Sequence, residues 1–201
     1  MDASTSLPAL PFPLRWDPPP VRFEVADTGS LQVRSGARTD LFVDPGGEGV
    51  FLNAPRLVGM PPAGDFQLSA RVSVDFASTF DAGVLLVWAD DARWAKLCFE
   101  FSPAGEPTVV SVVTRRTSDD ANAFTLTGST VWLRISRLSR AYAFHASTDG
   151  RSWTFVRHFE IGSDSARIGF ESQSPKGTGC TAVFDEIRFA TARLGDLRDG
   201  S

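Results

Sequence analysis

The stretch Phe66-Gln67-Leu68-Ser69-Ala70-Arg71-Val72-Ser73-Val74-Asp75-Phe76 decides the fold class, because every even position is apolar and every odd position is polar. Side chains of a β-strand point alternately to the two faces of a sheet, so this pattern predicts a strand with one face in the core. The same period recurs along the chain, and no window keeps helical spacing of apolar residues beyond a turn or two. The sequence therefore predicts an all-β protein.

More than a dozen such segments follow one another, separated by turns rich in glycine, proline and aspartate. They show no repeating period, so we expect two antiparallel sheets packed face to face rather than a propeller. The predicted architecture is a jelly-roll β-sandwich. Strands are expected at about residues 21–26, 31–35, 41–43, 49–53, 66–76, 82–89, 94–102, 107–115, 124–127, 131–137, 140–147, 152–160, 166–173 and 179–190.

The chain has 201 residues and no obvious internal linker. At roughly 150 residues per domain, it is predicted to form a single β-sandwich domain over 1–201. The core of this domain is expected at about residues 10–189. Residues 1–9 and 190–201 are expected to be loose termini.

Charge and hydropathy exclude several partners. Twenty Lys and Arg residues stand against 24 Asp and Glu residues, for a net charge of −4, so no basic field attracts nucleic acid. No apolar run approaches the roughly 18 residues that cross a bilayer, and the first residues lack a basic and apolar leader, so no membrane partner is expected. These features predict a cytoplasmic protein.

Metal and cofactor chemistry has little support in the sequence. Cys98 and Cys180 are far apart and are expected to be reduced thiols. The only histidines are His145 and His158, so a zinc site lacks ligands at any usual spacing. We therefore predict no metal and no cofactor.

Two hairpins allow strand faces to be assigned by cross-strand pairing. In the hairpin turning near residues 89–93, one face carries Leu85, Val87, Ala95 and Leu97, and the other carries Trp88, Trp94, Lys96 and Cys98. In the hairpin turning at Leu138-Ser139, one face carries Val131, Leu133, Ile135 and Phe144, and the other carries Trp132, Arg134 and His145. Each hairpin thus has one apolar face, expected in the core, and one that mixes tryptophan with charged residues.

A series of short motifs resembles a known family. The motifs are Asn53-Ala54-Pro55, Gly64-Asp65-Phe66, Ala82-Gly83-Val84-Leu85, Trp94-Ala95-Lys96-Leu97-Cys98-Phe99-Glu100, Ser111-Val112-Val113-Thr114, Trp132-Leu133-Arg134-Ile135, Ser147-Thr148-Asp149-Gly150-Arg151-Ser152-Trp153 and Gly169-Phe170-Glu171-Ser172-Gln173-Ser174-Pro175. Their order over about Leu10 to Phe189 resembles the regulation-of-enolase-protein-like family of the concanavalin A-like lectin and glucanase superfamily. The resemblance implies a concanavalin A-like sandwich whose concave face is the ligand surface, and no established reaction.

The mixed faces of the two hairpins supply the candidate ligand-binding residues. Sugars are bound by aromatic platforms under their C–H faces and by charged groups that hydrogen-bond their hydroxyls. The resemblance points to the same strand, through Trp94, Lys96 and Glu100. Under the competing structural interpretation, Lys96, Glu100 and Arg134 form an ion-pair ladder on a solvated face. The predicted binding set is Trp88, Trp94, Lys96, Glu100, Trp132, Arg134 and His145.

Three function classes stay open, and no catalytic residue is assigned. The favoured class is a noncatalytic lectin-like module for a saccharide or similar small polar ligand. The second is a protein-interaction module regulating a metabolic enzyme, which only the family name supports. The third is a glycoside hydrolase using Glu100, which needs a second carboxylate within about 5–9.5 Å. On this strand Lys96 and Cys98 replace the other acids of superfamily glucanases, so Glu171 on another strand is the candidate partner.

Two further motifs have structural interpretations. The hairpin 147–153 resembles an Asp-box, in which Asp149 accepts backbone N–H groups, Gly150 takes positive φ and Trp153 enters the core beside Phe155. Residues 115–122 contain adjacent acids but lack the alternating oxygen ligands of a calcium loop, so a solvated loop with local Arg–Asp pairing is expected.

Overall fold

The computed structural model describes residues 4–201, and within them every regular element is a β-strand. No helix in this part of the chain is long and apolar enough to cross a membrane. The strands are β1 (Arg15–Trp16), β2 (Arg22–Val25), β3 (Leu31–Arg34), β4 (Leu41–Val43), β5 (Val50–Leu52), β6 (Arg56–Gly59), β7 (Phe66–Val74), β8 (Ala82–Asp90), β9 (Arg93–Phe101), β10 (Pro107–Arg115), β11 (Thr117–Thr125), β12 (Thr130–Leu138), β13 (Ala141–Ser147), β14 (Thr154–Phe159), β15 (Arg167–Gln173) and β16 (Thr181–Ala190).

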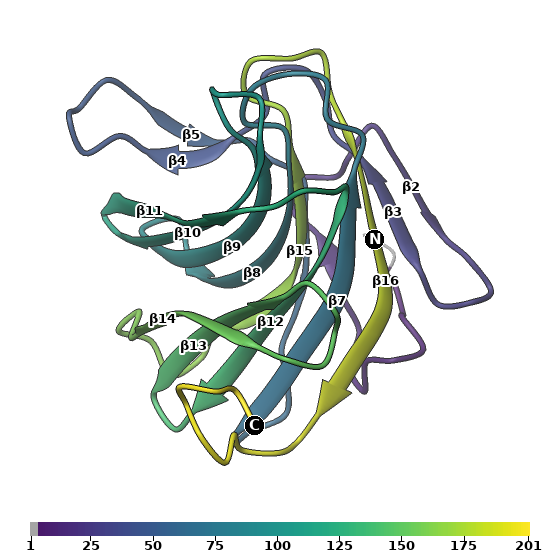
Figure 1. The fold of residues 1–201 in the computed structure, drawn as a ribbon, viewed down its shortest axis with the longest axis vertical. Coiled ribbons are helices and arrows are strands. Elements are labelled where there is room, and N and C mark those ends of the chain that lie inside the picture. Colours follow the sequence, from purple (N-terminus) through teal and green to yellow (C-terminus); the bar gives the residue numbers. More distant parts are fainter. Residues whose placement is uncertain (1–3) are drawn as a thin grey trace.

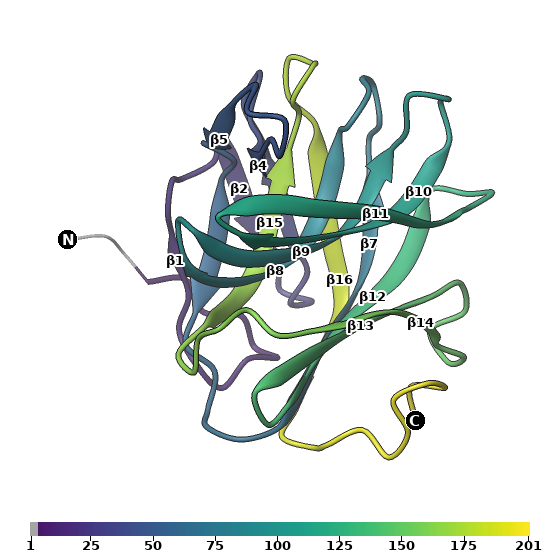
Figure 2. The same cartoon turned by 90° about the vertical axis from the view of Figure 1, so that its left-hand side faces the viewer.

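The strands form two seven-stranded antiparallel sheets that pack face to face (Figures 1 and 2). The first sheet has the order β1-β6-β15-β8-β9-β10-β11, and the second has the order β14-β13-β12-β7-β16-β3-β2. Strands β4 and β5 pair only with each other and form a separate hairpin. The predicted all-β sandwich is confirmed.

The core lies between the two sheets. Along β7, burial alternates without exception, as the period of two predicts. Leu85 and Leu97 of the first sheet, and Leu133, Ile135 and Phe144 of the second, are all 0% exposed. The apolar faces assigned to both hairpins are therefore confirmed as core faces.

A second apolar layer covers part of the outer face of the first sheet. Leu86, Trp88, Trp94, Val112 and their neighbours pack there against the β4–β5 hairpin, of which Leu41 is fully buried. The backbone N–H of Val43 donates to Ser118 Oγ at 2.9 Å, which ties the hairpin to β11. The central strands are therefore buried on both faces, which explains the unbroken apolar run of β8.

Two regions differ from expectation. Residues 117–122, expected in a solvated loop, belong to the edge strand β11, which extends to Thr125; most of its polar side chains face solvent while its backbone pairs with β10. The terminal segments are also packed rather than loose. Thr5 pairs with Leu14 and Leu7 is buried, whereas residues 1–3 lie outside the described residues. At the other end, Leu194 is buried as well.

Candidate functional site

The structure divides the seven predicted binding residues between the two sheets. Trp88, Trp94, Lys96 and Glu100 lie on the outer face of the first sheet, on β8 and β9. The remaining three, on β12 and β13, lie on the outer face of the second sheet: Trp132, Arg134 and His145. The core separates these faces, so the single binding surface expected from the sequence does not form.

The two tryptophans of the first sheet are not open platforms for a sugar. Trp88 and Trp94 are 1% and 0% exposed, and their rings stack with centroids 6.5 Å apart. The guanidinium of Arg56 covers the Trp88 ring at 4.0 Å. The expectation fails here because the β4–β5 hairpin packs on this part of the face.

The three residues of the second sheet make structural contacts. Trp132 Nε1 donates to Glu186 at 3.3 Å, and His145 Nε2 lies 2.9 Å from the carbonyl oxygen of Leu197. Arg134 stacks on Trp153 at 4.1 Å and donates to the carbonyl oxygen of Gly200. Trp153 is thus half-buried on the outer face, not in the core as expected. The C-terminal segment covers Arg134 and His145 through these contacts, so the face offers no open site at those two residues.

The neighbouring hairpin behaves as an Asp-box should. Asp149 Oδ1 accepts from the backbone N–H groups of Arg151 and Ser152, both at 2.8 Å. These hydrogen bonds lower the pKa of Asp149 well below its usual value. Gly150 has a φ of +71°, as the turn requires. The role of this motif is structural, as the sequence indicates.

Lys96 and Glu100 lie in one cavity of about 150 Å³, which we call the Lys96 pocket. Strand register brings its floor together, because Gln173 of β15 and Glu100 of β9 flank Ala82 of β8 in one row. The β4–β5 hairpin and the loop before β8 supply aromatic walls. The pocket is lined by Asp40, Phe42, Phe80, Lys96, Glu100, Val110, Val112, Asp120, Gln173 and Pro175.

A buried ammonium is the electrostatic centre of this pocket. Lys96 is 2% exposed, donates to Gln173 Oε1 at 2.8 Å and lies 3.8 Å from Asp40 Oδ1. Burial alone would lower the pKa of Lys96, but the surrounding acids, Glu171 first among them, raise it above the usual value. Lys96 therefore stays charged at neutral pH.

Two carboxylates near Lys96 have strongly shifted pKa values. Burial raises the pKa of Glu100 to about 7 and that of Glu171 to about 7, and Lys96 opposes both shifts. Glu171 is 0% exposed, and neither of its oxygens has a hydrogen-bond partner within residues 4–201. Glu100 lines the pocket and the fully buried Glu171 does not, so of these two carboxyl groups only Glu100 can contact a ligand there.

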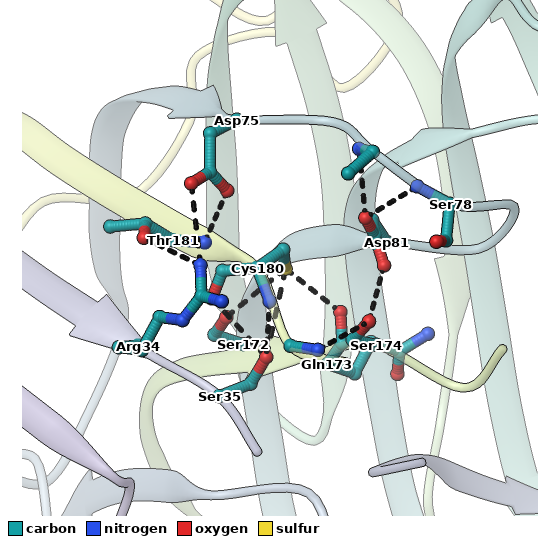
Figure 3. A network of polar contacts seen from close by, with 12 residues as sticks. Arg34, Ser35, Asp75, Ser78, Asp81, Ser172, Gln173, Ser174, Cys180 and Thr181 are labelled. Carbon is teal, nitrogen blue, oxygen red and sulfur yellow. Dashed lines mark hydrogen bonds and ion pairs between the residues drawn. The ribbon is translucent and has the colours of Figure 1, made fainter. Parts of the chain in front are cut away.

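A buried polar network holds the rim of the pocket in place (Figure 3). Asp81 accepts from Ser174 Oγ at 2.5 Å and from the backbone N–H groups of Ala77 and Ser78 at 3.0 and 2.8 Å. Gln173 Nε2 donates to the carbonyl oxygen of Phe80 at 3.4 Å. The network thus fixes two pocket residues, Phe80 and Gln173, relative to each other.

Both cysteines are free and buried, as expected. Cys180 belongs to the same network, where its Sγ donates to the carbonyl oxygen of Gln173 at 3.0 Å. Burial raises the pKa of Cys180 to about 11 and that of Cys98 well above its usual value. Neither thiol is therefore activated as a nucleophile.

The acids of residues 115–122 do not converge on a metal. Successive residues of a strand point to opposite faces, so Asp120 lines the Lys96 pocket while Asp119 pairs with Arg157 of β14 at 2.7 Å. The Arg–Asp pairing is thus between sheets and not local. Within residues 4–201, no group of three or more His, Cys, Asp or Glu residues is placed to hold a metal ion.

The fold of this chain is similar to those of several proteins of known structure. A functionally unknown protein from Saccharomyces cerevisiae has 23% identity and a TM-score of 0.81, over 90% of this chain and 97% of that one. The GH43 protein BlXynB of Bacillus licheniformis (K247S mutant) has 11% identity and a TM-score of 0.74, over 95% of this chain. The matched region is 38% of the BlXynB chain.

An alginate lyase from Klebsiella pneumoniae is more distant, with 13% identity and a TM-score of 0.53 over 85% of this chain and 84% of that one. At these identities the likeness shows the β-sandwich fold alone. No curated protein matches the sequence. The resemblance to the regulation-of-enolase-protein-like family, and the alternative that the protein regulates a metabolic enzyme, therefore stay predictions. Residues 16–192, most of the chain, match the family described as protein of unknown function DUF1349, and the protein belongs to that family.

Proposed function

We propose that the protein is a binding module for a saccharide unit or a similar small hydroxylated ligand, held in the Lys96 pocket. The supporting observation is a fixed, buried ammonium next to an accessible carboxyl group, Glu100, in one cavity. Gln173, Asp40 and Asp120 add further polar groups to the lining. Hydroxyl groups both donate and accept, so they match such a mixed set.

The size and apolar walls of the pocket support the same ligand class. Phe42 and Phe80 replace the predicted tryptophans as candidate aromatic contacts for C–H faces. The volume of about 150 Å³ is below the roughly 300–1,000 Å³ of pockets for drug-sized ligands. The pocket therefore suits one sugar ring or the end of a longer chain.

Glycoside cleavage is a second candidate, favoured by the pKa of Glu100. A carboxyl group with a pKa of about 7 can act as a general acid at neutral pH. Glu171, the partner expected from the sequence, is fully buried and cannot contact a substrate. The second acid of this alternative is therefore Asp40 or Asp120, which line the same pocket.

The substitution Glu100→Gln tests the proposed function. At pH 8 the wild-type carboxylate is charged, and loss of its charge-assisted hydrogen bond should weaken saccharide binding by about 1.5–3 kcal/mol, or roughly 10- to 150-fold. At pH 5.5 the wild-type carboxyl is protonated, so the two proteins should bind alike. A glycan array selects the saccharide, and isothermal titration calorimetry measures its affinity at both pH values.

The exposed acid Glu106 gives a matched control, since Glu106→Gln should leave affinity unchanged at both pH values. The hydrolase alternative makes a different forecast: Glu100→Gln would keep affinity and lose turnover of chromogenic glycosides. If Glu100→Gln leaves both affinity and turnover unchanged and instead alters stability by more than about 2 kcal/mol, Glu100 is a structural residue and the proposed function is wrong.

A further inference from the structure

A second cavity lies at the opposite end of the first sheet, where the β8–β9 and β10–β11 turns meet the loop before β15. It is a groove that opens widely to solvent, with a volume of about 940 Å³. Trp88, Ala89 and Ile161 are its apolar lining residues, and of these only Ala89 is more than marginally exposed. Four arginines line the same cavity, which we call the arginine groove: Arg93, Arg115, Arg116 and Arg167.

Two of these arginines have no side-chain partner among the described residues. Arg93 is neutralised by Asp90, with Nη2 and Oδ2 2.6 Å apart, and Arg115 donates to the Glu160 carbonyl oxygen at 3.4 Å. Arg116 and Arg167, by contrast, form no hydrogen bond or ion pair through their side chains anywhere in residues 4–201. A guanidinium presents five N–H donors in a planar fork that matches carboxylate and phosphate groups.

The backbone at Arg116 is an independent observation. Its φ is +76°, a left-handed conformation that costs a non-glycine residue energy and that glycine adopts freely. The turn is tight, because Arg115 pairs directly with Thr117, and the Arg116 N–H donates to the Ala92 carbonyl oxygen at 2.7 Å. The position would suit glycine, yet the chain places an arginine side chain there, on the lining of the groove.

The charge balance of the groove differs from that of the whole protein. The chain carries a net charge of −4, yet four of its 20 Lys and Arg residues line this one cavity. Of the three acids lining it, Asp90 pairs with Arg93, and Asp17 lies 3.9 Å from Arg56. Only Asp91 is left to oppose Arg115, Arg116 and Arg167.

We propose that the arginine groove binds a small anion, with its carboxylate or phosphate group held by Arg116 and Arg167. This site is separate from the Lys96 pocket and does not depend on the function proposed for it. Ala89, the apolar lining residue that is only half-buried, would contact the uncharged part of the ligand.

Calorimetric titrations with inorganic phosphate and with D-glucuronate test the proposal, with D-glucose as the neutral counterpart of glucuronate. At least one anion should bind and glucose should not bind at the groove, as followed by amide shifts of Ala92 and Gly162. Comparing the two titrations shows whether the groove binds a phosphate group or a carboxylate group. Arg116→Gln and Arg167→Gln should each weaken binding about 10-fold, because each removes one charge-assisted contact.

Two control variants separate loss of the binding site from loss of stability and from a general loss of positive charge. Arg116→Gly removes the guanidinium and relieves the positive φ, so it should weaken anion binding while stability stays equal or rises. Arg140→Gln removes an exposed arginine outside the groove and should leave affinity unchanged. The proposal is overturned if neither anion shifts Ala92 and Gly162, or if Arg140→Gln weakens binding as much as the groove variants do.

Discussion

Replacing Lys96 with methionine is expected to lower the free energy of unfolding at pH 8 by about 3–5 kcal/mol, the usual cost of removing one partner from a buried ionic cluster. Lys96 is 2% exposed and is the charge that offsets Asp40, Glu100 and Glu171. Methionine keeps the apolar stem and removes the ammonium, so the acids lose their counter-charge. Urea unfolding followed by tryptophan fluorescence measures the effect.

The stability of the protein should fall as pH rises, because of the shifted pKa of Glu171. The pKa of Glu171 is raised in the folded state to about 7 from an ordinary 4.5, so the folded protein binds this proton more tightly than the unfolded chain does. The resulting stability is present below about pH 4.5 and is lost as pH rises through about 7. Without Lys96 the pKa rises further, so the loss of stability with pH should steepen in Lys96→Met.

A double substitution isolates the pair. Adding Glu171→Gln to Lys96→Met removes the buried negative charge, so it should recover part of the lost stability at pH 8 and flatten the pH profile. Lys176→Met, at an exposed lysine, should change stability by less than about 0.5 kcal/mol. Equal losses at pH 5 and pH 8 for Lys96→Met, with no recovery from Glu171→Gln, would show that lost packing and not charge explains the effect.

Local patterns predicted the strands and their core faces well. The alternation at 66–76 depends only on neighbouring residues, and the register of the β8–β9 and β12–β13 hairpins depends on short turns. The sheet to which each hairpin belongs depends on distant partners, because β8 pairs with β15 and β12 pairs with β7. Period and turn length carry no information on those pairings. The prediction that the mixed faces of the two hairpins form one binding surface was therefore wrong.

Composition also gave wrong predictions for the edge strand β11 and for the outer face of the first sheet, which the β4–β5 hairpin covers. The polar residues 117–122 resemble a loop, yet an edge strand needs only backbone pairing on one side and can expose most of its side chains. The unbroken apolar run of β8 was a usable signal that its outer face is covered. The covering residues, Leu41, Phe42 and Leu52, are 30 or more residues upstream of β8 and show no sign of this role in the sequence.

The pocket was therefore only partly predictable. Lys96 and Glu100 were found because they share one strand with period two. Gln173 follows the same rule beside Glu171 on β15, and that alternation could have indicated it. Asp40 and Phe80 come from a hairpin and a loop whose positions depend on long-range packing, so no local pattern identifies them.

The loop before β8 provides the other large expected effect. Asp81→Ala should lower the free energy of unfolding by about 2–4 kcal/mol. Asp81 is 0% exposed, and its loss leaves the buried Ser174 hydroxyl and the part-buried backbone N–H groups of Ala77 and Ser78 without their acceptor. Chemical denaturation at pH 7 measures this loss. Saccharide affinity should also fall, since Phe80 and Gln173 lose their common support.

Asp81→Asn separates support from charge. The amide keeps one oxygen to accept from the Ala77 and Ser78 N–H groups, and its NH2 can donate to Ser174 Oγ, so the network of Figure 3 can persist. This variant should therefore lose clearly less stability than Asp81→Ala and keep saccharide affinity. Affinity is measured without denaturant, at a temperature at which Asp81→Ala is fully folded. If Asp81→Ala then binds the saccharide as tightly as the wild type does, the network supports the fold alone and does not position the pocket.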